Sequence, residues 1–130
     1  MPALADAARF TLAGIRIANG ATALVAPQKL AERLGVDEEE AGPMGYPFRM
    51  FGIRTILIGL ELVSRDPTVR GPAVRQAVLI HATDTVSALV TGVTGGLPRK
   101  GAVAATAISA INTGLALVAA RGDRLSGRAA

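Results

Sequence analysis

The sequence predicts an all-α fold, a four-helix transmembrane bundle with a short amphipathic helix after the first span. Half of the 130 residues are hydrophobic and 18% are charged, with a mean hydropathy of +0.40. Ala, Leu, Val and Ile dominate four segments that Pro, Gly and charged residues separate. The 15 glycines favour close helix packing in a membrane. We therefore expect one membrane domain over residues 1–130.

The first span is expected at about residues 6–26 and stops at Pro27. The next segment, PQKLAERLG, has Pro at its start and Gly at its end, which is typical helix punctuation. Leu30 and Leu34 lie on one face of it, since positions four apart are neighbours on a helix. These features predict a short amphipathic helix on a surface such as the bilayer interface.

The other three spans are expected at about residues 48–63, 73–93 and 101–120. A polar connection with an acidic run, VDEEEAGPMGYP, precedes the second span, and such a run indicates a solvated loop or a helix N-terminus. The fourth segment has twenty residues without a charge, enough for a helix to cross about 30 Å of hydrocarbon. The polar tail, 121–130, is expected to fray.

Charged and polar side chains interrupt the other three segments, and they favour the alternative of a soluble helical domain. Arg16 lies in the first, Arg54 and Glu61 in the second, and His81 and Asp84 in the third. A soluble surface helix, however, has a broad polar face, and these segments have one or two such residues each. The membrane interpretation therefore remains the preferred one.

Charged groups inside a bilayer cost about 2.5–3.5 kcal/mol each at the span centre, so they are expected to face the bundle interior and pair there. His81 and Asp84 are three positions apart and therefore neighbours on one helix face. Arg54 and Glu61 are seven apart in FGIRTILIGLELV, on one stripe that we expect to face inward. The candidate polar core or ligand site consists of Arg16, Asn19, Arg54, Glu61, His81, Asp84 and Asn112.

Two short echoes support this network. AGIRIANG in the first segment is similar to FGIRTILIG in the second, and DTVSALV in the third is similar to NTGLALV in the fourth. The echoes place an arginine on two segments and an acceptor, Asp84 or Asn112, on the other two. Arginine only donates hydrogen bonds, and Asp and Asn accept them.

Two interpretations of this network remain open. It fixes helix register, or it forms a polar pocket or proton-responsive site in which His81 titrates near neutral pH. We expect no metal and no cofactor, because a single His with Asp and Glu is a thin ligand set and no cysteine is present. No motif for nucleophilic or phosphate chemistry occurs, so no catalytic residue is assigned. The scattered basic residues do not indicate nucleic acid binding.

The chain resembles the DoxX-like family of small bacterial four-span membrane proteins of unknown function. The proline-stopped ATALVAP, the helix QKLAERLG, the segment FRMFGIRTILIGLEL and the mid-span Asp84 carry this resemblance. It covers about residues 8–120. It implies an integral membrane four-helix bundle and no established activity, cofactor or catalytic residue.

We therefore expect a multi-pass protein of the cell membrane, either an accessory subunit or a small-molecule-binding bundle, and a non-enzymatic role is favoured. The alternatives are a redox or lipid-modifying component acting on a lipophilic substrate such as a quinone, and a soluble helical binding domain. The expected partners are the lipid bilayer and a larger membrane protein or a second copy.

The basic residues predict that both termini are cytoplasmic. The side with the termini holds Arg9, Arg65, Arg70, Arg75, Arg121, Arg124 and Arg128, and the other holds Lys29, Arg33, Arg49, Arg99 and Lys100.

Overall fold

In the computed structural model, residues 2–129 are described, and they form five α-helices. The helices are α1 (Pro2–Val25), α2 (Pro27–Arg33), α3 (Glu38–Leu62), α4 (Pro67–Val93) and α5 (Arg99–Ala129). The predicted all-α fold is confirmed. α2 is the short helix that Pro27 was expected to begin, and the four long helices contain the four apolar segments.

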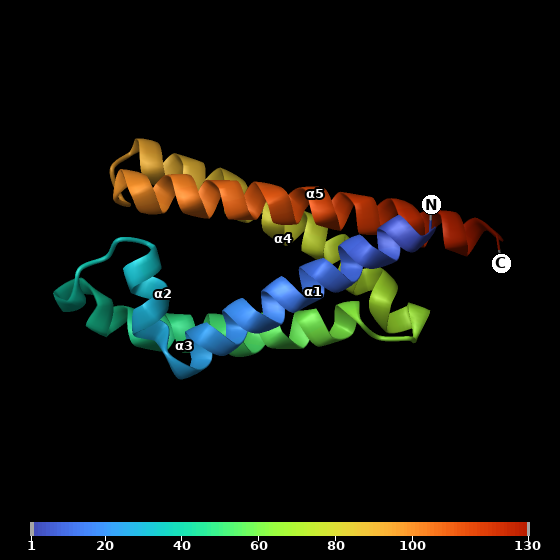
Figure 1. Cartoon of the computed structure of the whole chain (residues 1–130), viewed down its shortest axis with the longest axis horizontal. Coiled ribbons are helices and arrows are strands. Elements are labelled where there is room, and N and C mark those ends of the chain that lie inside the picture. The colour runs from blue at the N-terminus through green and yellow to red at the C-terminus, as the bar shows by residue number, and fades with distance from the viewer. Residues whose placement is uncertain (1, 130) are drawn as a thin grey trace.

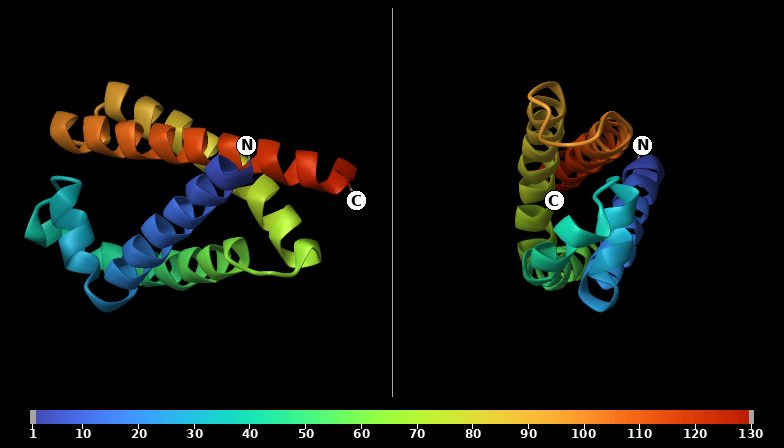
Figure 2. Two further views of the ribbon diagram at one scale, coloured as in Figure 1. Left: turned by 45° about the vertical axis from the view of Figure 1, so that its right-hand side comes forward. Right: turned by 90° about the vertical axis from the view of Figure 1, so that its left-hand side faces the viewer.

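The long helices run along the length of the molecule in two pairs, α1 with α3 and α4 with α5 (Figure 1). α1 crosses between the pairs and also packs against α5 (Figure 2). Both chain termini and the α3–α4 turn lie at one end, which we call the terminal end (Figure 1). α2 and the α4–α5 turn lie at the opposite end, which we call the α2 end.

α3 begins much earlier than the sequence predicts, at Glu38 rather than near residue 48. Its first turn contains the acidic residues Glu38, Glu39 and Glu40. Negative side chains are favourable there because the unpaired N–H groups make the start of a helix electropositive. Of the two readings of the acidic run, the helix N-terminus is the one that occurs, and the helix continues through Pro43 and Pro47.

α4 also begins early, at Pro67 rather than near residue 73. The Asp66 side chain accepts hydrogen bonds from the Thr68 backbone N–H at 2.8 Å and from the Thr68 hydroxyl at 2.7 Å. Asp at the N-cap followed by Pro in the first turn is a favourable helix start. The SRDPTVRGP stretch therefore supplies a helix start as well as a turn.

The tail that was expected to fray continues α5 as far as Ala129. Tertiary contacts hold this part of the helix. A Cβ on Gly122 would collide with Ala5 of α1, so the two helices touch there. Asp123 pairs with Arg70 of α4. The prediction of a frayed tail was therefore wrong for residues 121–129, which continue the helix.

Close backbone contact joins α1 and α3. A Cβ added to Gly20 would lie 2.7 Å from the Gly52 carbonyl oxygen, and one added to Gly52 would lie 2.6 Å from the Gly20 carbonyl oxygen. A Cβ on Gly59 would lie 2.7 Å from a side-chain carbon of Ile17. At Gly20 and Gly52 no larger residue fits without movement of one helix, because the nearest atoms are backbone, whereas at Gly59 the Ile17 side chain would have to shift. Such glycine contacts are typical of helices that pack in membranes.

The apolar core lies between all four long helices and is built mainly from alanine. Its buried members are Leu12, Ala13, Leu62, Ala73, Val74, Ala77, Ala116, Ala119 and Ala120. Many larger apolar side chains are exposed instead, among them Val25 at 80%, Leu79 at 70% and Ile111 at 61%. Small residues thus occupy the helix interfaces, and large apolar residues cover the outside.

Among the described helices, one is long and apolar enough to cross a membrane by length and composition. It is α5, over the stretch Arg99–Leu125.

Candidate functional site

Arg16 of α1 and His81 of α4 meet inside the bundle. Both are buried, with 3% and 5% of their surface exposed, and Arg16 Nη1 lies 2.5 Å from His81 Nε2. A guanidinium only donates hydrogen bonds, so Nε2 of the ring accepts. In the neutral imidazole, the proton then resides on Nδ1. This contact joins two helices that the sequence alone does not pair.

Asp84 lies one turn after His81 on α4. Its Oδ2 is 3.7 Å from His81 Nδ1, and its side chain is 48% exposed. This distance is longer than a direct hydrogen bond and suits a bridging water between the ring N–H and the carboxylate. The Nδ1–H that the Arg16 contact requires faces this carboxylate. Guanidinium, imidazole and carboxylate thus follow one another from the interior to the surface.

Asn112 of α5 is buried, with 5% of its surface exposed. Among the described residues, its Oδ1 accepts no hydrogen bond, and Arg16 Nε donates none. Each unsatisfied buried polar atom costs about 1–3 kcal/mol. Among the side chains that the structure describes, the interior therefore keeps one unused donor, Arg16 Nε, and one unused acceptor, Asn112 Oδ1.

The predicted inward stripe on α3 lies on a different face. Arg54 and Glu61 do share one side of the helix, but both are exposed. The buried face of α3 consists of Gly52, Thr55, Gly59 and Leu62. Because α1 and α3 touch backbone to backbone at the glycines, that face has no room for an arginine or a glutamate.

Glu61 lies in the last turn of α3, near the terminal end, and makes no ion pair with Arg65 among the described residues. Asn19 is half-buried on α1, and no interaction of its side chain is found within residues 2–129. Of the seven predicted residues, the structure joins three in a row of contacts, Arg16, His81 and Asp84, and buries Asn112 separately.

The sequence echoes do not place equivalent residues in equivalent surroundings. Arg16 is buried whereas Arg54 is exposed, and Asn112 is buried whereas Asp84 is half-exposed. A short match in a chain rich in Ala, Leu and Gly does not fix the direction in which a helix faces its neighbours.

A pocket of about 410 Å³ opens between α3 and α4 beside this row. Its charged lining residues are Arg16, Arg54 and Asp84, and its aromatic ones are Tyr46 and Phe51. Arg54 therefore belongs to the candidate site through the pocket rather than through the buried core. The remaining lining residues are almost entirely apolar. The pocket therefore combines three charged side chains with an apolar wall.

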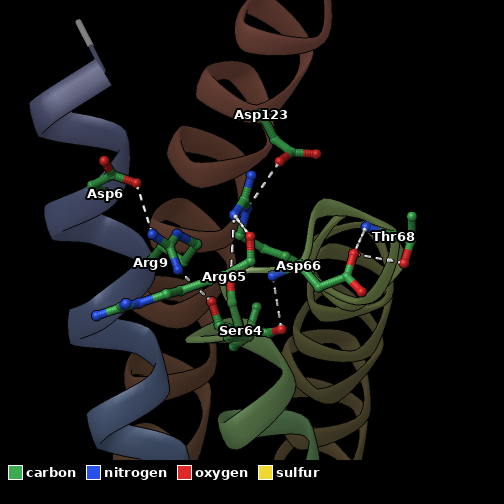
Figure 3. Close-up of polar contacts among 9 residues, drawn as sticks. Asp6, Arg9, Ser64, Arg65, Asp66, Thr68 and Asp123 are labelled. Carbon is green, nitrogen blue, oxygen red and sulfur yellow. Dashed lines mark hydrogen bonds and ion pairs between the residues drawn. The ribbon is translucent and has the colours of Figure 1, made fainter.

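A second polar cluster, at the terminal end, was not predicted. Arg9 of α1 donates to the Leu62 carbonyl oxygen at 2.6 Å and pairs with Asp6 at 2.8 Å (Figure 3). Arg70 of α4 pairs with Asp123 of α5 at 3.4 Å. These contacts join α1 to α3 and α4 to α5 at one end of the bundle, which indicates a structural role. The spacing of Asp6 and Arg9 was the one local signal for it.

Comparison of the chain with family models, curated proteins and solved structures finds no match. The resemblance to the DoxX-like proteins therefore stays a prediction. Within residues 2–129, no group of three or more His, Asp or Glu side chains is arranged to hold a metal ion.

Proposed function

We propose that this protein is a small integral membrane protein of the DoxX-like type whose four long helices span the bilayer and enclose a binding site for a small lipophilic molecule. The observation that carries the proposal is the polarity of the bundle. Its centre contains the Arg16–His81 contact, whereas large apolar side chains cover its outside. Water-soluble proteins rarely expose extended apolar surface without a partner that covers it.

The exposed apolar residues come from every long helix, which supports a surrounding lipid phase rather than a single docking partner. Phe10 is 53% exposed on α1, Leu57 52% on α3, Leu79 70% on α4 and Ile111 61% on α5. For α5 itself, only 22% of the most apolar stretch is buried. The core helix of a soluble protein would be mostly buried.

Helix length is consistent with spanning. The shortest of the four long helices, α1, has 24 residues, which corresponds to about 36 Å and exceeds the roughly 30 Å of hydrocarbon. α1, α3 and α4 fail a strict test of apolarity because of a few charged residues. In α1 and α4 these include Arg16 and Asp84, which lie in one row with His81. Arg16 faces inward, which is the usual arrangement of charged groups inside membranes, whereas Asp84 is half-exposed.

The proposed location is the cell membrane, with both termini on the cytoplasmic side. Both termini and the α3–α4 turn share one end of the bundle, as four spans require (Figure 1). Basic residues are more numerous at this end, and cytoplasmic loops carry the excess of Lys and Arg.

A first experiment is alkaline carbonate extraction of membranes from cells that express the chain. The protein is expected to stay in the pellet and to enter solution only with detergent. Recovery in the soluble fraction without detergent would leave the alternative, a soluble helical domain, as the correct one.

A second experiment uses the absence of cysteine in the natural chain. Arg65→Cys lies at the terminal end and Lys100→Cys at the α2 end, and both side chains are exposed. A membrane-impermeant maleimide added to intact cells should label Lys100→Cys only, and permeabilised cells should label both. If intact cells label both variants, the two positions lie on the same side of the membrane and α4 does not cross it. If intact cells label Arg65→Cys alone, the protein spans the membrane in the opposite orientation.

A second candidate function is a redox or lipid-modifying component acting on a lipophilic substrate. The pocket between α3 and α4 favours this second function, because its wall combines apolar residues with Arg16 and Asp84. Binding and chemistry are separated by incubating the purified protein with a candidate lipophile. Recovery of unchanged ligand supports binding alone, and turnover supports the second candidate.

A further inference from the structure

Arg54 is the unmatched charge of the pocket. Among the described residues it forms no ion pair and no hydrogen bond, although it lines the pocket together with Arg16 and Asp84. An unpaired arginine within a membrane span is costly. A negatively charged group beside Arg54 would offset that cost.

The other two charges of the pocket balance each other. Arg16 and Asp84 flank the His81 ring, with Nη1 at 2.5 Å from Nε2 on one side and Oδ2 at 3.7 Å from Nδ1 on the other. With a neutral ring, this row carries one positive and one negative charge. Arg54 then leaves the pocket with a net charge of +1 by the formal charges of its lining residues.

Arg16 also lines the pocket and keeps one unused donor in the interior. The residue is buried, with 3% of its surface exposed, and its Nε has no hydrogen-bond partner among the described residues. A bound anionic oxygen would meet Arg54, because Arg54 lines the pocket and is exposed, whereas Arg16 Nε is buried. Charge-assisted hydrogen bonds of this kind are among the stronger polar contacts in proteins.

The rest of the pocket suits an apolar chain. Phe51, Ile58 and Ile80 belong to its wall, and Phe51 is 44% exposed at the surface that we propose faces lipid. The volume of about 410 Å³ is within the range of small-molecule sites. A chain that leaves the pocket beside Phe51 enters the hydrocarbon without crossing polar surface.

From these features we propose that the pocket between α3 and α4 binds an amphiphile with one negatively charged head group, held by Arg54, and an apolar chain along α3 and α4. The head group is the carboxylate of a free fatty acid or the phosphodiester of an anionic phospholipid. This inference rests on the proposed membrane function, and it names the class of ligand for that site.

Tyr46 supplies the readout. It is the only tyrosine in the chain, which has no tryptophan, and it lines the pocket. The purified protein is reconstituted into phosphatidylcholine vesicles, and Tyr46 fluorescence is titrated with three brominated quenchers. The quenchers are dibromostearate, phosphatidylglycerol with dibrominated chains and phosphatidylcholine with the same chains. Their quenching curves are compared on the scale of mole fraction in the membrane.

We expect at least one of the two anionic quenchers to act at lower mole fraction than brominated phosphatidylcholine, and the more effective one identifies the head group. Arg54→Gln is expected to weaken this preference about tenfold, the effect of losing one charge-assisted hydrogen bond. Arg49→Gln is the matched control, because Arg49 is also an exposed arginine of α3 but does not line the pocket. It should keep the preference.

Equal quenching by all three probes would overturn the inference, and so would an equal loss in the Arg49→Gln and Arg54→Gln proteins. Because Arg54 is exposed, the unfolding midpoint of Arg54→Gln should equal that of the natural chain, which separates lost binding from lost folding. Vesicle flotation is measured on the same samples. A protein that does not float with the vesicles refutes the membrane proposal, whereas one that floats without any anionic preference refutes this inference alone.

Discussion

Arg16 and His81 are separated by 65 positions in the chain, yet Arg16 Nη1 lies 2.5 Å from His81 Nε2 in the interior of the bundle. The contact joins α1 of one helix pair to α4 of the other. It also fixes the roles of the two groups, because the guanidinium donates and the imidazole nitrogen accepts.

Replacing His81 by Leu should therefore destabilise the protein. Arg16 would stay buried without its acceptor, and a loss of about 3 kcal/mol is expected for an unsatisfied buried charged group. The measurement is denaturant unfolding of the purified protein in detergent. His81→Gln is the control, since its side-chain oxygen can still accept. Equal losses in both variants would contradict the acceptor role of His81.

The α1–α3 contact predicts opposite effects for two glycines. Gly52→Ala should destabilise the protein by about 1–3 kcal/mol, because its Cβ would lie 2.6 Å from the Gly20 carbonyl oxygen and the helices would have to separate. Gly14→Ala meets nothing within 4 Å and should stabilise by up to about 1 kcal/mol through helix propensity. Thermal unfolding in one detergent compares them. A Gly52→Ala protein as stable as the Gly14→Ala protein would rule out close helix contact at this point.

Asn112→Leu should leave stability unchanged or raise it by about 1 kcal/mol, because the substitution removes a buried acceptor that has no donor and keeps a similar volume. Asn112→Ala removes the same acceptor but leaves a cavity, so it should be the less stable of the two. Unfolding midpoints of the two variants and the natural chain decide the matter. A Leu variant clearly less stable than the natural chain would mean that the Asn112 oxygen is satisfied.

Asp66 predicts a pH dependence that lies outside the proposed spans. The pKa of its carboxyl is lowered from the ordinary 3.8, first by the hydrogen bond from the Thr68 hydroxyl and then by the one from the Thr68 backbone N–H. A lowered folded-state pKa means that the stabilising effect is complete above the unfolded pKa. It is lost as the pH falls below about 4 and through the folded pKa.

Asp66→Asn tests this, because the amide oxygen can still accept from Thr68 but does not titrate. The unfolding midpoint of the natural chain should exceed that of the variant at pH 6, and the difference should shrink toward acid. A difference that stays constant from pH 6 to acid would contradict the carboxylate cap. The effect is small, since Asp66 is exposed.

The sequence by itself determined the helical class and most of the turns. Pro27 begins α2 as predicted, whereas the start of α4 at Asp66 and Pro67, before residue 73, was not predicted although its signal is local. Gly35 and Gly95 have positive φ values of 73° and 79° in the turns after α2 and α4, where left-handed backbone suits glycine. The closeness of His81 and Asp84 was also predictable, because residues three positions apart lie on the same side of a helix. All of these are local relationships that a few consecutive residues settle.

Only the tertiary structure decided which side of each helix faces the interior. Arg54 and Glu61 share a stripe as their spacing predicts, but the glycine face of α3 packs against α1 and turns that stripe outward. The pairing of Arg16 with His81 and the extension of α5 through the polar tail likewise depend on residues far away in the chain. Helical periodicity shows which side chains lie together, but the choice of buried face depends on how closely a neighbouring backbone can approach. Between α1 and α3 the two backbones approach each other most closely at Gly20 and Gly52, and this packing leaves Arg54 at the edge of a pocket.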